Sequence, residues 1–309
     1  MDMRAYQLEA QKTDQVPSPA RAAEADASLV VPLLGLAGET GELLTEYKKR
    51  LRDGEAHRMF KDRVSEELGD LLWYVANVAS KFDLDLNVIA EANLKKVRDR
   101  WGEGQAAAAV DFDAGYPETE RFPRRFEMDF TEVKVEGRVK MRLLKDGKPV
   151  GNELTDNAYD PDDGYRFHDV FHCAYAAVLG WSPVIRKLHG RKRKSNATVD
   201  EVEDGARAAA IEEGLSAMVF EYARQHNFLD GVPALDYSLL RTVKEVTSQL
   251  EVSKCGLGSW EKAILQGFAV WRDLKRNRGG RVLVDLDAHR ISYVGAVAKT
   301  TRGLTKGAQ

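Results

Sequence analysis

Between residues 29 and 101, apolar side chains recur with the period of an α-helix, and two acidic pairs are set among them. The pairs are Glu39 with Glu42 and Glu67 with Asp70. At about 100° per residue, Glu67 falls inside the apolar arc of its helix and Asp70 lies at the edge of that arc. An ionised carboxylate on a packed face is costly unless a cation neutralises it. The pattern therefore predicts helices whose acids share a positively charged partner.

Two antiparallel helices would bring these four carboxylates to one place. Four oxygen ligands without a histidine suit Mg²⁺, or Mn²⁺ in its place, better than zinc. Helix-interior glycines also support a binding site, since they are tolerated where a ligand or another helix approaches closely; they are Gly35, Gly38, Gly41 and Gly69. A solvated acidic face is the alternative, and the residues alone leave both interpretations open.

The helical pattern resolves into segments with short connections, as in a helix bundle. We expect a short helix at about 4–13 and longer helices at 31–52, 61–82 and 86–101. Asp53-Gly54 is the stop signal of the first long helix. Its expected core stripe is Leu33, Leu36, Leu43, Tyr47 and Leu51. The sequence thus predicts an N-terminal all-α helical bundle over residues 1–104.

The remainder of the chain has a different pattern. A stretch rich in Ala, Gly and Pro is interpreted as a linker over residues 105–122. Residues 126–136 and 138–144 alternate apolar with polar side chains, as strands do. Helical patterns cover 165–180, 199–225, 235–250 and 260–276, and a late hairpin covers 281–285 and 289–294. We therefore predict that residues 123–309 form an α+β, mainly helical domain with two short β-hairpins.

Composition and charge exclude several classes of protein. The net charge of −3 means that the whole chain is not an electrostatic nucleic-acid binder. Two cysteines, Cys173 and Cys255, are too few for a disulfide scaffold or a four-thiolate zinc site, and they fit a reducing compartment. The polar N-terminus lacks a signal-peptide core, and no apolar run could span a bilayer. We expect a cytoplasmic protein without a membrane partner.

At residues 33–43, 66–74 and 92–97 the sequence reads LLGLAGETGEL, EELGDLLWY and ANLKKV. These segments, preceded by Tyr6-Gln7, resemble the MazG-like all-α nucleoside triphosphate pyrophosphohydrolases. The resemblance covers about residues 4–102, a third of the chain. Two acid motifs in the proper order, with the Asn-to-Lys segment behind them, make it fairly specific.

The resemblance implies a function and a set of site residues. It implies Mg²⁺-dependent cleavage of a (d)NTP between the α and β phosphates, giving (d)NMP and pyrophosphate, and a bundle completed as a homodimer or higher homo-oligomer. The four acids would be the metal ligands. Asn93 and Lys96 would contact the phosphates, with Arg100 a further candidate; a solvated helix end is the alternative for the two cations. The rival function is a nucleotide-sensing or nucleic-acid-associated regulator that binds nucleotide without turnover.

The second half offers one further candidate metal site. His168 and His172 are four residues apart, a spacing that can bind a metal ion. Glu201, Asp204 and Glu212 share an arc if residues 199–225 form one helix. One hypothesis is a degenerate second metal-binding hairpin. We favour the simpler interpretation, in which two amphipathic helices are tied together by hydrogen bonds between histidine and carboxylate.

A dense basic segment spans residues 186–194, with six Lys or Arg in nine positions. It could grip the phosphates of a nucleic acid or a nucleotide. No interleaved aromatic residues support a surface on which single-stranded bases stack. A solvated loop is therefore the favoured interpretation, and a nucleic-acid partner is the less favoured one.

Overall fold

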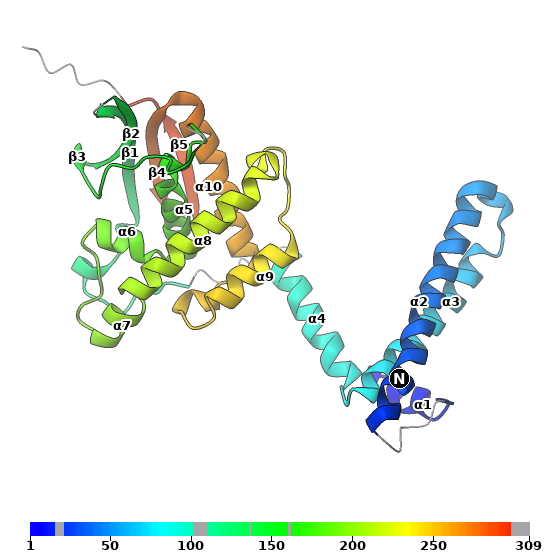
Figure 1. Ribbon diagram of the computed structural model, residues 1–309. Coiled ribbons are helices and arrows are strands. Elements are labelled where there is room, and N and C mark those ends of the chain that lie inside the picture. Colours follow the sequence, from blue (N-terminus) through cyan, green and yellow to red (C-terminus); the bar gives the residue numbers. More distant parts are fainter. Residues whose placement is uncertain (16–21, 102–109, 136, 160–161, 298–309) are drawn as a thin grey trace, which may run out of the picture. The chain divides into compact units, whose positions relative to one another are not determined.

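The computed structural model describes residues 1–15, 22–101, 110–135, 137–159 and 162–297, with the side chains of 22–27 and 99–101 outside that description. The chain divides into two compact units, Met1–Arg98 and Asp99–Gln309 (Figure 1). Each unit has its own cluster of buried apolar residues. Within the described ranges, no helix has both the length and the apolarity needed to cross a bilayer.

The first unit is built on a helical hairpin (Figure 1). Its elements are α1 (Met3–Gln11), α2 (Ala22–Asp53), the short 3-10 helix η1 (Gly54–Ala56), α3 (Phe60–Lys81) and α4 (Leu86–Trp101). Because only a few residues separate α2 from α3, the two helices lie side by side and run antiparallel. The all-α N-terminal domain is therefore confirmed. Helix α2 begins earlier than residue 31 and continues through Pro32.

A buried glutamine holds α1 to the turn between α3 and α4. The Gln7 amide nitrogen donates to Ser80 Oγ at 3.0 Å and to Leu84 O at 2.8 Å. Its amide oxygen accepts from Leu86 N at 2.8 Å. All hydrogen-bonding atoms of the Gln7 side chain thus serve to fix this corner, and a buried amide needs such partners to be tolerated.

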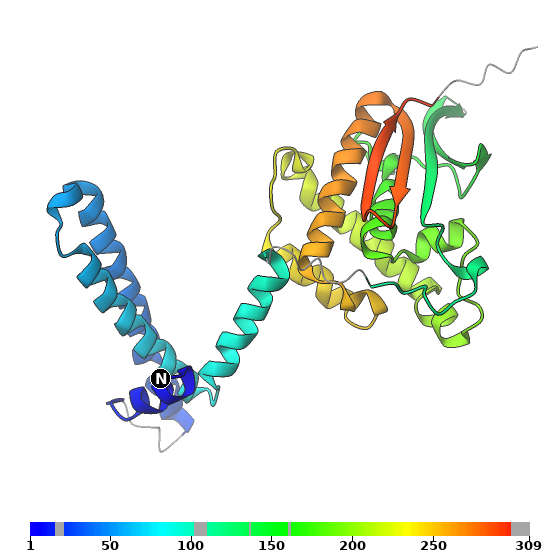
Figure 2. The ribbon, with the colours of Figure 1, turned by 180° about the vertical axis from the view of Figure 1, so that it is seen from behind.

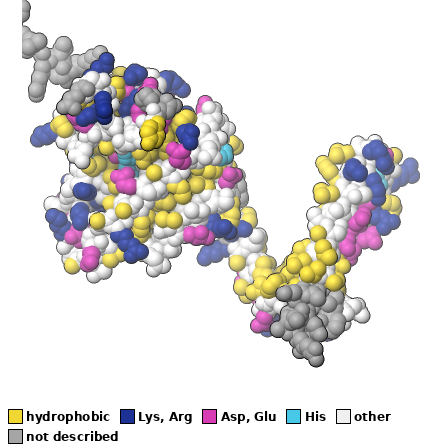
Figure 3. All heavy atoms as spheres, viewed as in Figure 1, with side chains coloured by type: hydrophobic (Ala, Val, Ile, Leu, Met, Phe, Trp, Pro, Cys, Tyr) yellow, Lys and Arg dark blue, Asp and Glu magenta, His cyan; other side chains and the backbone are white. Residues whose placement is uncertain are grey.

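The described residues of the first unit bury little apolar surface. Its small core is Ala10, Ala76 and Leu86, with Met3, Tyr6 and Trp73 packed against it. Along one face of α2, Leu33, Leu44, Tyr47 and Leu51 are 47–70% exposed. Figure 3 shows apolar side chains gathered on the visible surface of this unit. The expected core stripe of α2 was therefore wrong in part: three of its members, Leu33, Tyr47 and Leu51, face outward in the single chain.

The second unit contains a five-stranded antiparallel sheet of order β3-β2-β1-β4-β5. Its strands are β1 (Arg125–Val135), β2 (Arg138–Lys145), β3 (Lys148–Pro149), β4 (Gly279–Asp285) and β5 (Arg290–Gly295). Asp129 of β1 lies opposite Leu144 of β2 on one side and Arg281 of β4 on the other. Both expected hairpins are present. The pairing of β1 with β4, which joins them into one sheet, was not predicted.

Two helices pack against the sheet beside β4 and β5 (Figure 2). They are α5 (Asp169–Leu179), all of whose residues are buried, and α10 (Leu257–Asn277). The other helices are η2 (Glu118–Glu120), η3 (Tyr165–Phe167), α6 (Pro183–Leu188), α7 (Ala197–Val202), α8 (Ala206–Arg224), η4 (Asn227–Leu229), α9 (Tyr237–Val246) and η5 (Glu251–Lys254). The α+β, mainly helical second half is thus confirmed.

Part of the expected linker belongs to the second unit instead. Within residues 110–122, Asp113 and Phe122 are buried. The Asp113 carboxylate accepts from Phe122 N at 2.8 Å and pairs with Arg186. These contacts fold the segment onto the domain that follows it. The remaining expected linker residues, 105–109, lie outside the described residues.

The single helix expected over 199–225 is two helices, α7 and α8, separated at Gly205. The carbonyl oxygen of Glu201 approaches so closely that a Cβ at position 205 would lie 1.8 Å from it. Only glycine fits such an approach. Because the helix is interrupted there, the helical phase does not continue from Glu201 and Asp204 to Glu212. The predicted grouping of these three residues required an unbroken helix, so it was wrong.

Candidate metal centre

Three carboxylates of the helical hairpin converge on one point. Glu39 of α2 and Glu67 and Asp70 of α3 each offer an oxygen, and these oxygens lie within 4.8 Å of one another. Glu39 and Glu67 are half-buried and Asp70 is exposed. Glu42, one helical turn beyond Glu39, is exposed and acts on Glu67 through its charge. The antiparallel pairing of α2 with α3 thus brings the predicted acids together.

None of these four acids forms an ion pair with a lysine or arginine among the residues that the structure describes. Neighbouring acids differ in this respect. Glu66 pairs with Arg63 at 2.7 Å, and the buried Glu46 pairs with Lys49 and with His57 Nε2. The hairpin therefore neutralises its other close-packed acids and leaves the cluster with excess negative charge.

The pKa of Glu67 reflects this excess charge. Partial burial raises the pKa, and the hydrogen bond to Glu39 and the charges of Glu39, Glu42 and Glu66 raise it further. Like charges held this close favour a proton, or another cation, between them. A divalent cation would relieve the repulsion, and carboxylate oxygens are the ligands that Mg²⁺ and Mn²⁺ prefer.

The helix backbone beside the acids is open. A Cβ added at Gly38, Gly41 or Gly69 would meet no described atom within 4 Å. Gly35 differs, because a Cβ there would lie 2.2 Å from the ring of Tyr74 on α3. Gly35 therefore lets the two helices approach, and the other three glycines leave space next to the carboxylates.

The residues expected to contact phosphates lie on α4. Asn93 and Lys96 are exposed. Figures 1 and 2 show α4, which carries both residues, diverging from the α2–α3 hairpin, and neither residue belongs to the converging group of Glu39, Glu67 and Asp70. The side chain of Arg100 lies outside the described residues.

In the second unit, the structure brings together only some of the predicted residues. His168 and His172 lie near each other, and His172 Nδ1 donates to Glu212 Oε1 at 2.9 Å. Asp169 and Glu213, neither of which was predicted as a ligand, lie beside the two histidines. Asp204 is elsewhere, in ion pairs with arginines, and Glu201 is exposed.

The basic segment 186–194 is not a solvated loop throughout. Arg186 and Arg193 are among the most deeply buried side chains of the protein. Arg193 makes ion pairs with Asp204 at 2.7 Å and with Glu251 at 2.6 Å. Arg186 pairs with Asp113 and stacks over the ring of Phe122 at 4.1 Å. Two of the six cations thus hold the core together and are not available to a nucleic acid.

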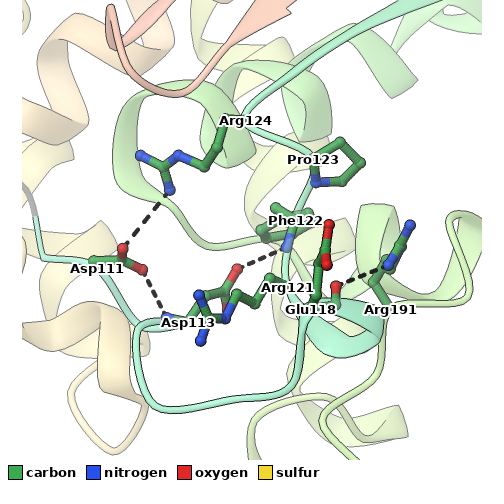
Figure 4. Close-up of a pocket in the computed structure, with 8 residues that line it drawn as sticks. All are labelled: Asp111, Asp113, Glu118, Arg121, Phe122, Pro123, Arg124 and Arg191. Atoms are coloured by element: carbon green, nitrogen blue, oxygen red, sulfur yellow. Dashed lines mark hydrogen bonds and ion pairs between the residues drawn. The ribbon is translucent and has the colours of Figure 1, made fainter.

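A pocket of about 490 Å³ opens next to this segment (Figure 4). Its charged lining is mixed in sign, with Arg121, Arg124 and Arg191 beside Asp111, Asp113 and Glu118. Figure 4 shows Arg124 facing Asp111, 3.9 Å away, and Arg191 donating to the Glu118 carbonyl at 2.9 Å. The arginines are largely engaged with protein acceptors, so the pocket lacks the excess positive charge that a triphosphate site requires.

Comparison with known protein families gives the class of protein first. A family profile for the MazG nucleotide pyrophosphohydrolase domain matches residues 31–103. The first unit is therefore a nucleotide pyrophosphohydrolase domain, and the protein is a hydrolase. A second profile, for the MazG C-terminal domain, matches residues 107–297, which is more than half of the chain. The chain therefore belongs to the MazG family. Hydrolases of this family generally use a divalent metal ion.

The chain is also similar to an individual protein. The Gene 37 protein of Mycobacterium phage L5 is 38% identical over 80 residues, which are 25% of this chain and 70% of that protein. No solved structure matches the chain.

Proposed function

We propose that the first unit hydrolyses nucleoside or deoxynucleoside triphosphates between the α and β phosphates, with Mg²⁺ or Mn²⁺ bound by Glu39, Glu42, Glu67 and Asp70. One observation carries the proposal: three of these carboxylates offer oxygens within 4.8 Å of one another, on a hairpin that pairs its other close-packed acids with cations. The oxygen-only donor set fits a hard divalent ion. The family supports a nucleotide as the substrate.

When bound, the metal ion would neutralise charge on the triphosphate and on the leaving pyrophosphate. The protein fixes the positions of the carboxylate ligands. Glu39 and Glu42 are fixed by α2, and Glu67 and Asp70 by α3, so the packing of the hairpin sets the spacing of the carboxylates. The open backbone at Gly38, Gly41 and Gly69 leaves room for a phosphate chain beside them. Asn93 and Lys96, with Arg100, are the proposed phosphate contacts.

We also propose that the enzyme works as a homodimer or higher homo-oligomer. The exposed stripe of Leu33, Leu44, Tyr47 and Leu51 lies within about 60° of arc on α2 and extends for about 27 Å. Apolar residues on α4 are exposed as well, among them Val88 and Leu94. A second copy of the hairpin offers the matching apolar face, and burying such stripes is what drives helices to associate.

The rival function, nucleotide or nucleic-acid binding without turnover, depended on the basic segment. Burial of Arg186 and Arg193 removes much of that support. No other described feature favours it over hydrolysis. The same assay separates the two functions, since a regulator would bind nucleotide but release no pyrophosphate.

The proposal is tested with the full chain and a panel of natural and modified NTPs and dNTPs in Mg²⁺ or Mn²⁺, with pyrophosphate as the readout. Glu67→Gln keeps the shape of the side chain but removes its charge, and should lower kcat/KM by at least about 100-fold, as expected for losing one charge-stabilising group. Glu66→Gln is the matched control, because Glu66 is adjacent but pairs with Arg63. Full activity in Glu67→Gln, or equal losses in both variants, would contradict the site.

A further inference from the structure

A second cluster of metal-ligating side chains lies in the other unit, where η3 and α5 meet α8. His168, Asp169 and His172 each offer one nitrogen or oxygen that could bind a metal ion, and these three atoms lie within 4.8 Å of one another. From α8, Glu213 Oε2 lies 3.5 Å from His168 Nε2 and 3.4 Å from His172 Nε2. Asp169 Oδ1 lies 3.8 Å from His168 Nε2. Two imidazoles and two carboxylates thus face one small volume.

Hydrogen bonds orient both imidazoles with Nε2 toward that volume. His168 Nδ1 lies 2.9 Å from the carbonyl oxygen of Tyr165, and His172 Nδ1 lies 2.9 Å from Glu212 Oε1. Both partners can only accept, so both Nδ1 atoms carry the proton and donate it. In a neutral ring the lone pair is then on Nε2. Metal-binding histidines commonly have this arrangement, with the second nitrogen donating to a carboxylate or a carbonyl.

The supporting contacts are themselves fixed. Glu212 is completely buried, and besides His172 it accepts from Ser182 Oγ at 2.5 Å and from Val184 N at 2.9 Å. The ring of Tyr165 stacks on that of His168, with centroids 4.5 Å apart and planes 11° from parallel. The histidines are therefore held in place by partners outside the cluster, as a binding site requires.

Within this cluster, His172 Nε2 is the atom that most needs a ligand. It is completely buried, and among the described residues it makes no hydrogen bond. Buried polar atoms are otherwise almost always satisfied.

We propose that His168, Asp169, His172 and Glu213 bind one divalent transition-metal ion of the zinc type, with Glu212 as a positioning residue that holds His172. The pair of imidazoles selects such an ion over Mg²⁺, which prefers oxygen ligands. The Glu213 side chain is 47% exposed, so the ion has a route of entry. The ion would tie α5 to α8. This site is separate from the oxygen-only cluster proposed for hydrolysis.

Zinc binding to the full chain tests the proposal. A background of Glu67→Gln with Asp70→Asn disables the carboxylate cluster. After removal of metal with EDTA, the chain is titrated with Zn²⁺, and separately with Co²⁺, whose visible absorption reports nitrogen ligation. We expect one Zn²⁺ per chain and a Co²⁺ spectrum that His168→Gln abolishes. Glu213→Gln, at a partly exposed position where the fold should survive, should weaken Zn²⁺ binding at least about tenfold.

The matched control is Glu221→Gln, an exposed acid two turns further along α8 that pairs with Arg224 at 2.8 Å. It should bind Zn²⁺ as tightly as the parent. The proposal is overturned if the parent binds no Zn²⁺, or if Zn²⁺ affinity is the same with and without the Glu213→Gln and His168→Gln substitutions. It is also overturned if Mg²⁺ competes for the same residues with equal affinity. In those cases the cluster is a protonated His172 paired with Glu212 and Glu213.

Discussion

Arg193 is a charged side chain in the core of the second unit, and its guanidinium is almost fully used. It donates to Asp204 and Glu251, and the Asp204 carboxylate also accepts from the backbone nitrogen of Arg193 at 2.7 Å. Burial alone would lower the pKa of Arg193, but these acids raise it, so the residue stays charged. A buried ion pair of this kind is costly to break because the remaining acids are left without a partner.

Arg193→Ala should therefore lower the free energy of unfolding by about 3–5 kcal/mol. The measurement is urea denaturation of the full chain followed by tryptophan fluorescence, to which the buried Trp181, Trp260 and Trp271 contribute. Lys194→Ala, at the exposed neighbouring position, should change stability by no more than about 0.5 kcal/mol. Equal effects of the two substitutions would show that the basic segment is solvated after all.

His189 should make the second unit sensitive to acid. Burial and the nearby charges of Lys145 and Arg191 lower its pKa to about 3. The folded state therefore keeps the ring neutral, while the unfolded chain takes up a proton below about pH 6.5. This contribution to stability is present above that pH and is lost as the pH falls from about 6.5 toward 3.

His189→Gln should accordingly flatten the dependence of unfolding free energy on pH between 6.5 and 4, by up to about 1.4 kcal/mol per pH unit. Chemical denaturation at a series of pH values measures the slope. His226→Gln, at an exposed position, is the control and should leave the slope as it is. An unchanged slope in His189→Gln would mean that this ring is protonated in the folded protein.

The two acid clusters differed in how far they could be predicted. Glu67 could be predicted to converge with other acids because one helix carries both its apolar arc and its acids, and phase within an unbroken helix can be read from the sequence. Glu213 was missed because it lies outside the buried arc of α8, with a side chain that is 47% exposed, whereas the neighbouring Glu212 is buried. Asp204 was misplaced because the helix is interrupted at Gly205, so its phase does not continue into α8. Local pattern cannot show that a turn intervenes when the flanking residues all favour helix.

At the scale of elements, Gly35 of α2 makes room for the Tyr74 ring of α3. Gly35→Ala adds a methyl group where the Tyr74 ring lies, so the ring must move. Gly38→Ala adds it in open space. Both substitutions replace glycine inside a helix by alanine, which favours the helical state by about 1 kcal/mol. In thermal unfolding of the metal-free chain, Gly38→Ala should be stabilised and Gly35→Ala should not. Equal stabilisation would mean that the helices are further apart than the structure shows.

Most helices lie close to their expected positions because helical periodicity is a local signal. Asp53-Gly54 ends α2, and α4 begins at Leu86, as expected. The sheet could be predicted only as separate hairpins, since the pairing of β1 with β4 joins residues that are 152 positions apart. Nothing in either strand alone specifies that partner. The buried part of the basic segment was missed for a related reason, because Asp113 and Glu251, which neutralise it, are distant in sequence.

At the scale of the whole molecule, the apolar stripe of α2 predicts self-association. Leu51→Glu places a charge in the stripe at its end distant from Glu39 along α2. In sedimentation experiments the parent should be a dimer or larger, and Leu51→Glu should shift the population toward the monomer and lower the stability of the first unit. Val246→Glu, at an exposed apolar position in the second unit, is the control. A monomeric parent would contradict the proposal.

The position of β1 between β2 and β4 has a consequence for synthesis on the ribosome. The β1–β2 hairpin can form as soon as residue 145 has emerged, but β4 begins only at residue 279. Until then, one side of β1 offers unpaired backbone groups to any passing strand. Distant pairing also slows folding. Nascent chains of this protein should therefore recruit holding chaperones late in translation, and messages truncated before β4 should yield aggregates.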